Sequence, residues 1–179
     1  MSRRCARPPE PLPTSLAAAL EIASAADAWL VQRLWSHLAV GFLGGPPKTG
    51  KSWLAIDLAV SVASATPCLG RFPVAHPGPV LCYLAEDALP QVRARIASLC
   101  AHRGLAIAAL PLHVITAPAL FLDDPDHRAR LAVTIERIRP GLLVLDPLVR
   151  LHRRDENSSQ EVSALLGFLR LLSRAHRLA

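Results

Sequence analysis

The chain has 179 residues, of which 51% are hydrophobic and 19% are charged. This composition fits one folded domain of ordinary size and excludes a chain that is disordered throughout. The 20 Lys and Arg residues outnumber the 14 Asp and Glu residues, which gives a net charge of +6. A basic chain favours an anionic partner such as a nucleotide or a nucleic acid, although a basic surface is also a common way to remain soluble.

The N-terminal residues 1–28 are predicted to form a Pro/Arg-rich lead and extension rather than a second domain. Residues 1–13 hold several arginines and four prolines but no apolar stretch, so no secretory signal is expected. Residues 15–35 follow with a loosely helical apolar pattern. We assign residues 29–179 to a single domain.

From residue 38 onward, apolar segments alternate with helix-forming segments. Strands are expected at 38–43, 80–85, 112–116 and 142–145. Helices are expected at 51–64, at 89–102, after an acidic turn at 123–126 with Leu131, Ile135 and Ile138 inward, and from about 160 to 177. Strands without polar alternation, separated by amphipathic helices, predict a three-layer α/β fold with a mostly parallel sheet covered on both faces.

One stretch, residues 104–122, has the length of a membrane span and carries no formal charge over 19 residues. Pro111 and Pro118 would each interrupt a helix there, and the segment between them is typical of a short buried strand. No membrane segment is therefore predicted.

The cysteines are scattered, with no CxxC pair and no histidine at metal-ligand spacing; they are Cys5, Cys68, Cys82 and Cys100. This pattern argues against a disulfide framework or a zinc site and favours reduced thiols in the cytoplasm.

The strongest motif lies between the first strand and the first long helix of the domain, and it reads Gly45, Pro46, Pro47, Lys48, Thr49, Gly50, Lys51 and Ser52. It matches G-x-x-x-x-G-K-[ST] in full, in the strand–turn–helix context that a phosphate-binding loop needs. Glycines let the backbone wrap a phosphate, Lys51 supplies a positive charge to the β- and γ-phosphates, and the Ser52 hydroxyl suits Mg²⁺. ATP with Mg²⁺ is thus the expected ligand, and a chance match is the alternative.

Two further features of this segment bear on nucleotide binding. Pro46 and Pro47 remove two backbone donors from the loop. Trp53, directly after Ser52, is a candidate nucleotide contact, but a position in the helix–sheet core is the favoured interpretation.

Carboxylates follow two of the predicted strands. Asp146 ends the strand at 142–145, at the edge of the sheet where nucleotides bind in α/β folds, and would hold Mg²⁺ together with Ser52. The alternative is that Asp146 only initiates a turn before a proline. Glu86 follows the strand at 80–85 and is a candidate to orient and deprotonate an attacking water. On spacing alone, the slightly favoured role of Glu86 is that of an acid in the first turn of the following helix, which the helix dipole stabilises.

Three segments, FLGGPPKTGKSWLA, VLCYLAEDALPQVRARI and LLVLDPLVRLHRRDENS, together resemble the RecA-type P-loop ATPases. Among these they are most similar to the RepA-like hexameric replicative helicases and their AAA-family ATPase relatives. The resemblance implies that residues 29–179 form a partial RecA-like ATP-binding domain, with Lys51 and Glu86 in catalysis and Asp146 in the Walker B position. It also implies a hexameric full-length parent that acts on single-stranded DNA.

The loop after Asp146 falls where RecA-like proteins often contact DNA. The candidate contacts are Arg150, Arg153 and Arg154, since guanidinium groups bind phosphates without sequence preference. Asp155 and Glu156 follow at once, so a solvated loop of mixed charge is the competing interpretation. No aromatic residue is interleaved among these arginines, so no base-stacking platform is evident.

In the resembled family, a further apolar strand with a polar, γ-phosphate-sensing end lies between the Walker A and Walker B strands. This sequence reaches Ala179 where that strand is expected to begin. Three outcomes are open: the sequence is a fragment, which we favour; the two neighbouring strands close the gap directly; or a partner supplies the strand.

The favoured function is ATP binding and hydrolysis coupled to DNA, as in a helicase or a replication ATPase. The alternative is a DNA-binding or assembly protein that uses nucleotide as a switch without turnover. A small-molecule P-loop kinase is weaker, because no lid-like arginine cluster follows a phosphate-acceptor site.

Overall fold

The structure is a computed structural model, and it describes residues 28–153 and 159–179. Its strands are β1 (Trp29–Val31), β2 (Trp35–Ser36), β3 (Val80–Leu84), β4 (Leu112–Val114) and β5 (Leu142–Asp146). Its helices are α2 (Lys51–Ser64), α3 (Leu89–His102), α4 (Pro125–Ile138) and α5 (Ser159–His176), with short 3₁₀ helices η2 (Ile107–Ala109) and η3 (Leu148–Arg150).

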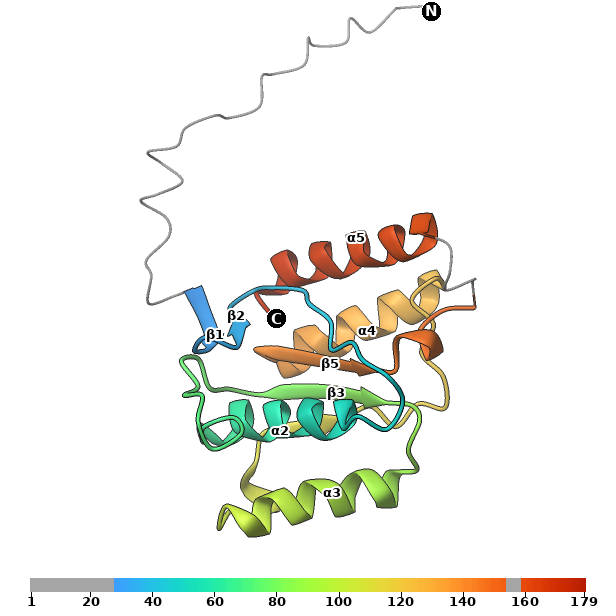
Figure 1. The fold of residues 1–179 in the computed structure, drawn as a ribbon. Helices are drawn as coiled ribbons and strands as arrows, with labels where there is room; N and C mark the ends of the chain where they lie inside the picture. The colour runs from blue at the N-terminus through green and yellow to red at the C-terminus, as the bar shows by residue number, and fades with distance from the viewer. Residues whose placement is uncertain (1–27, 154–158) are drawn as a thin grey trace, which may run out of the picture.

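The main sheet has three parallel strands in the order β4-β3-β5. Helices α2 and α3 cover one face, and α4 and α5 cover the other (Figure 1). The predicted three-layer α/β fold with a parallel sheet is therefore confirmed. In this register Leu84, the last residue of β3, pairs with Asp146, the last residue of β5.

Strand β3 shows why the sequences of the strands are continuously apolar. Its side chains alternate between faces, so Val80 and Cys82 pack toward α2, whereas Leu81 and Tyr83 pack in the cluster that contains α4 and α5. All four are at most 3% exposed. A strand buried on both faces must be apolar at every position.

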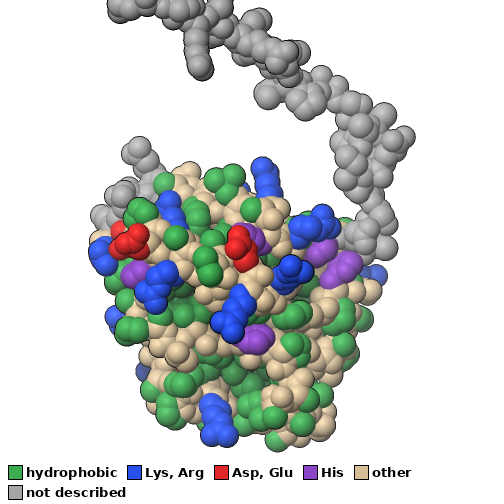
Figure 2. Space-filling view, turned by 180° about the vertical axis from the view of Figure 1, so that it is seen from behind, with side chains coloured by type: hydrophobic (Ala, Val, Ile, Leu, Met, Phe, Trp, Pro, Cys, Tyr) green, Lys and Arg blue, Asp and Glu red, His purple; other side chains and the backbone are tan. Residues whose placement is uncertain are grey.

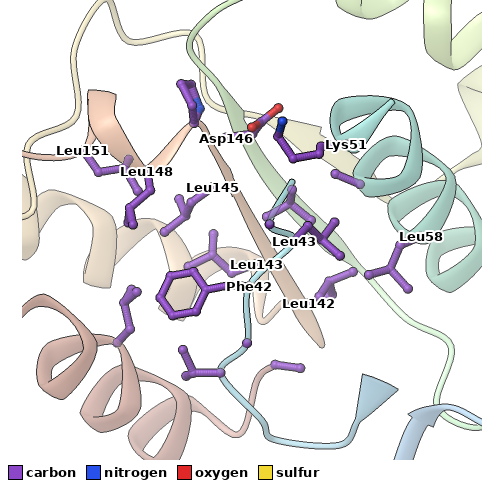
Figure 3. Close-up of a pocket in the computed structure, with 18 of the residues that line it drawn as sticks. Phe42, Leu43, Lys51, Leu58, Leu142, Leu143, Leu145, Asp146, Leu148 and Leu151 are labelled. Atoms are coloured by element: carbon purple, nitrogen blue, oxygen red, sulfur yellow. The ribbon is translucent and has the colours of Figure 1, made fainter. Parts of the chain in front are cut away.

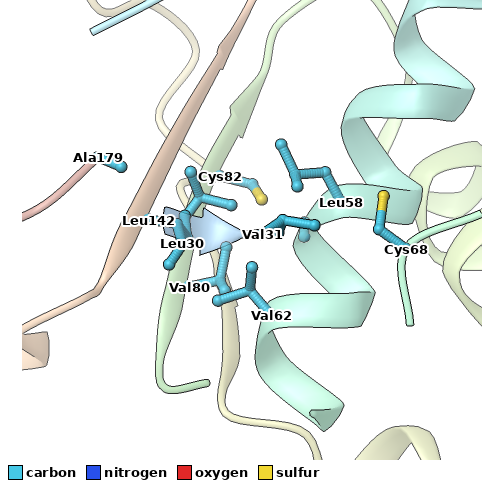
Figure 4. Close-up of a cluster of buried hydrophobic side chains, with 10 residues drawn as sticks. Leu30, Val31, Leu58, Val62, Cys68, Val80, Cys82, Leu142 and Ala179 are labelled. Carbon is cyan, nitrogen blue, oxygen red and sulfur yellow. The ribbon is translucent and has the colours of Figure 1, made fainter. Parts of the chain in front are cut away.

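The cluster on the α2 side also anchors the segment that precedes the candidate phosphate loop. Leu30 and Val31 of β1 are fully buried against Leu58 and Val62 of α2 and against Val80 of β3 (Figure 4). The buried carboxylate of Asp57, in the middle of α2, pairs with Arg103. The apolar contacts fix α2 against the sheet, and the ion pair joins it to the end of α3; together they fix the residues at the N-terminus of α2.

Residues 29–36 form a small antiparallel pair, β1 and β2, so the helix expected over 15–35 is wrong in this part; residues 15–27 lie outside the described residues. Tertiary hydrogen bonds explain the difference: Gln32 N–H donates to the Pro73 carbonyl at 2.9 Å, and Ala75 N–H donates to the Leu30 carbonyl at 2.9 Å. Such contacts outweigh a weak local helix pattern.

The expected strand at 38–43 is also wrong, because these residues form no strand. A strand needs a neighbour for its backbone groups, and β5 does not pair with this segment. Direct closure of the gap by the two neighbours therefore does not occur in this structure. At this edge of β5, Ala179 N–H donates to the Gly141 carbonyl at 3.0 Å, and Leu143 N–H donates to the Ala179 carbonyl at 2.8 Å.

Helix α4 begins as the acidic turn predicts. The Asp124 side chain caps the helix by accepting from the N–H groups of Asp126 at 3.0 Å and His127 at 3.4 Å, and Pro125 occupies the first turn. Leu131 and Ile135 are buried, and Ile138 is partly buried against the same cluster, as expected.

The uncharged stretch at 104–122 resolves into short elements, η2 and β4, separated by loops. Among the residues that the structure describes, no helix combines the length and the apolar character needed to cross a membrane.

We predict that Leu30→Ala will lower the free energy of unfolding by about 2 to 5 kcal/mol, because it leaves a cavity beside α2 and β3. Chemical denaturation followed by circular dichroism measures this change. The matched control is Leu171→Ala, whose side chain is 67% exposed, and it should cost far less. Equal losses in the two variants would contradict the position of β1 in the core.

Candidate functional site

The motif residues form a loop at 45–50 and the start of α2 at Lys51 and Ser52, as the sequence predicts. Gly50 is the N-cap of α2 with φ 85°, a left-handed conformation that suits glycine, and no side chain caps this helix end. The first N–H groups of a helix have no partner within the helix, and they carry its positive dipole. The N-terminus of α2 can therefore bind an anion with its backbone.

The loop is folded around the ammonium group of Lys51. Lys51 Nζ donates to the carbonyls of Gly45 and Pro46, each at 2.8 Å, and Thr49 Oγ1 donates to the Pro46 carbonyl at 2.8 Å. A Cβ at Gly45 would lie 3.2 Å from Thr49 Oγ1, so this close turn favours glycine. The loop thus holds a positive charge at its centre, beside the open end of α2.

The two residues predicted to hold a metal ion are in direct contact. Ser52 Oγ donates to Asp146 Oδ2 at 2.7 Å, although the residues are 94 positions apart in sequence. Hydroxyl and carboxylate oxygens are the hard ligands that Mg²⁺ accepts, and phosphate and water oxygens complete its shell in nucleotide sites. Within the described residues no group of three or more His, Cys, Asp or Glu side chains could hold a metal ion on its own. The donor set therefore fits Mg²⁺ bound together with a phosphate.

Glu86 lies on the turn between β3 and α3, at the same edge of the sheet as Asp146. The N–H of Ala85 donates to the Asp146 carbonyl at 2.8 Å, which ties the start of this turn to the end of β5. Glu86 itself is exposed, so its carboxylate is accessible to water and to a ligand. The parallel register thus brings Glu86 and Asp146 to neighbouring strand ends, as expected.

Trp53 does not belong to the core, and the favoured interpretation of this residue is wrong. Its side chain is 45% exposed on the first turn of α2, while the buried face of the helix begins at Ala55. Its ring faces α3, where the guanidinium carbon of Arg95 lies 5.6 Å from the ring centroid. The same Arg95 forms an ion pair with Asp87. Sequence reasoning missed Arg95; its only signal was a basic residue on the helix that follows Glu86 and Asp87.

The loop after β5 has a mixed environment. Arg150 is exposed at the end of η3, and Arg154 lies outside the described residues. The guanidinium carbon of Arg153 lies 4.2 Å from the centroid of the Phe121 ring, and Arg153 Nη2 lies 3.9 Å from Asp124 Oδ2. Arg153 therefore already contacts the acidic turn. On the face seen in Figure 2, Lys and Arg side chains are spread among neutral and hydrophobic ones rather than gathered in one patch.

A cavity of about 680 Å³ separates residues 39–45 from β5. Apolar side chains such as Phe42, Leu143 and Leu145 line most of it, and Lys51 and Asp146 stand together at one end (Figure 3). Leu143, Val144 and Leu145 of β5 are only half-buried, although the neighbouring strand β3 is buried. The cavity explains this difference, because it lies against β5.

The three-layer fold and the phosphate loop at the head of α2 define a P-loop nucleotide-binding domain. A family model described as an AAA domain matches residues 5–179, nearly the whole chain, and the protein therefore belongs to this family of P-loop ATPases. Membership indicates a nucleotide-binding ATPase domain. Comparison with curated proteins gave no significant match.

We predict that Ser52→Ala and Asp146→Asn will each weaken binding of a non-hydrolysable ATP analogue in Mg²⁺, because the first removes a ligand oxygen and the second removes the carboxylate charge; the loss should be about 10- to 100-fold, the scale of changes in the surroundings of a metal site. In EDTA the variants and the parent protein should bind the analogue alike. Calorimetric titration measures both conditions, with Ser98→Ala on the exposed face of α3 as the control. Equal losses with and without Mg²⁺ would refute a metal role for these side chains.

Proposed function

We propose that this protein binds Mg²⁺ and ATP at residues 45–52 and hydrolyses ATP. The observation that carries the proposal is the hydrogen bond between Ser52 and Asp146, because it joins the phosphate loop to the carboxylate at the end of β5. A metal ion that binds both side chains would sit directly beside the phosphates held by α2.

Each predicted site residue has a distinct task in this proposal. Amides of the loop and of the first turn of α2 bind phosphate oxygens, and Lys51 neutralises charge on the β- and γ-phosphates. Ser52 and Asp146 would hold Mg²⁺, which supplies further charge neutralisation at the phosphates when bound. Trp53, at the rim of the site, is a candidate contact for the nucleotide.

Glu86 acts as the general base. Its carboxylate accepts a proton from the attacking water while the water oxygen forms a bond to the γ-phosphorus. The bond from that phosphorus to the bridging oxygen breaks, and ADP leaves with the electron pair. The position of Glu86 supports this role. The N–H of the preceding residue, Ala85, donates a hydrogen bond to the Asp146 carbonyl, so Glu86 lies beside the end of β5.

We further propose that turnover is coupled to single-stranded DNA in a RepA-like helicase or replication ATPase, within a homo-oligomer that the resemblance implies to be hexameric. Arg150, Arg153 and Arg154 are the proposed DNA contacts. Residues 29–179 are proposed as the RecA-like domain, with residues 1–28 as its extension.

We also propose a cytoplasmic location, which is consistent with free, buried thiols at Cys68, Cys82 and Cys100. Burial raises the pKa of the Cys82 thiol to about 12.

A second candidate is a protein that binds nucleotide as a switch without hydrolysis. The contact between Ser52 and Asp146 supports it as well, because holding Mg²⁺ beside a phosphate does not require turnover. The two candidates predict the same binding and different turnover.

We predict that Lys51→Ala will abolish measurable ATP binding, and that Glu86→Gln will retain binding but lower the rate of hydrolysis at least 100-fold, because only the second variant leaves the phosphate loop intact. Calorimetry and phosphate release measure the two quantities. Arg137→Ala, an exposed residue at the end of α4, is the control for loss of positive charge.

Two results would change the proposal. Unaltered ATP affinity in Lys51→Ala would refute the site itself. Tight ATP binding by the parent protein without phosphate release, with or without DNA, would favour the switch.

We predict that Arg150→Ala and Arg153→Ala will weaken binding of mixed-sequence single-stranded DNA to a similar extent for all sequences. Each lost phosphate contact should reduce the slope of log K against log salt by about 0.7. Fluorescence anisotropy over a salt series measures this slope, with exposed Arg130→Ala on α4 as the control. Unchanged slopes in both variants would refute DNA contact by these arginines and would favour the alternative, a solvated loop of mixed charge.

A further inference from the structure

Arg95 joins the two structural elements on which the proposed reaction depends. Its guanidinium group forms an ion pair with Asp87, the residue directly after Glu86, and it lies over the ring of Trp53, the residue directly after Ser52. One side chain of α3 therefore contacts both the turn that carries Glu86 and the helix that carries the phosphate loop.

The turn that carries Glu86 has an anchor on each side of it. On one side, the Ala85 N–H donates to the Asp146 carbonyl at 2.8 Å. On the other side, the Asp87 carboxylate accepts a hydrogen bond from Arg95. The Glu86 side chain itself is exposed, so its direction depends on the backbone that these two bonds hold.

The helix that carries Arg95 is packed against α2. Val92 and Ile96, on either side of it on α3, are buried against Ile56 and Val60 of α2. The Arg95 and Asp87 side chains are 28% and 20% exposed, so water only partly screens their ion pair. A planar guanidinium can bond a carboxylate and lie over an aromatic ring at once, which an ammonium does less well.

We propose that Arg95 is a positioning residue: by holding Asp87 and Trp53 together, it fixes the carboxylate of Glu86 where that group can deprotonate the water that attacks ATP. This inference rests on the proposed function, because it assigns a role within that reaction. Displacing a reacting group by about 1 Å can cost on the order of 100-fold in rate. In this role Arg95 affects the rate of the chemical step and not the binding of the phosphates.

The test measures phosphate release by the full chain at saturating and at limiting Mg·ATP. Arg95→Ala and Asp87→Asn should each lower kcat about 10- to 100-fold and change KM less than about twofold. The double variant should be no slower than the worse single variant, since both remove the same contact. Arg95→Lys should recover part of the loss because it keeps the charge, and exposed Arg93→Ala is the matched control on α3.

A second readout separates positioning from folding. Thermal unfolding of each variant shows whether the fold survives, and affinity for Mg·ADP should stay within about twofold of the parent protein. Affinity for Mg·ADP with fluoroaluminate, which mimics the transferred phosphoryl group, should fall in parallel with kcat.

The outcomes are distinct. If Arg95→Ala and Asp87→Asn lower the melting temperature but leave kcat unchanged, the ion pair is only a structural contact and the inference is wrong. A matching fall in kcat for Arg93→Ala would also overturn it. No hydrolysis by the parent protein would refute the proposed enzyme and this inference with it, whereas hydrolysis that Glu86→Gln abolishes and Arg95→Ala spares would refute this inference alone.

Discussion

The hydrogen bond between Ser52 and Asp146 is the contact on which the rest of the site depends. It joins the first turn of α2 to the end of β5 at 2.7 Å, across 94 positions of sequence. It can form only if α2 is packed at one depth against the sheet and β5 is in register with β3. The hydrophobic core therefore determines the geometry at which phosphate and metal would bind, and the polar site has little tolerance for a shift of α2.

The same packing explains why the site lies at one edge of the sheet. Parallel strands end together, so the pairing of Leu84 with Asp146 brings the turn after β3 next to the strand end that carries the carboxylate. Glu86 and the Arg95 ion pair lie on that turn and on the helix that follows it. The phosphate loop, the proposed metal ligands and the proposed base thus come from segments far apart in sequence that one sheet edge brings together.

Much of this arrangement could be predicted from the sequence, where local signals agree with the tertiary structure. The bounds of α2 and α3 follow from the glycine before Lys51 and the proline in the first turn of α3, and β3 and β5 follow from their apolar runs. The segment 38–43 could not be predicted, since a strand depends on a neighbour that no local pattern reveals. Trp53 and Arg95 were misjudged or missed for a similar reason, because their roles arise from a contact between two helices.

Amide hydrogen exchange of the loop is the most direct test of the central claim that a triphosphate binds at residues 45–52. With saturating Mg·ATP, exchange at Gly50, Lys51 and Ser52 should slow strongly, and exchange on the turn that carries Glu86 should slow to a smaller extent. The buried amides of β3 should change little, because they are already bonded within the sheet. Unchanged exchange at these three amides with bound nucleotide, or protection confined to another part of the chain, would contradict the claim.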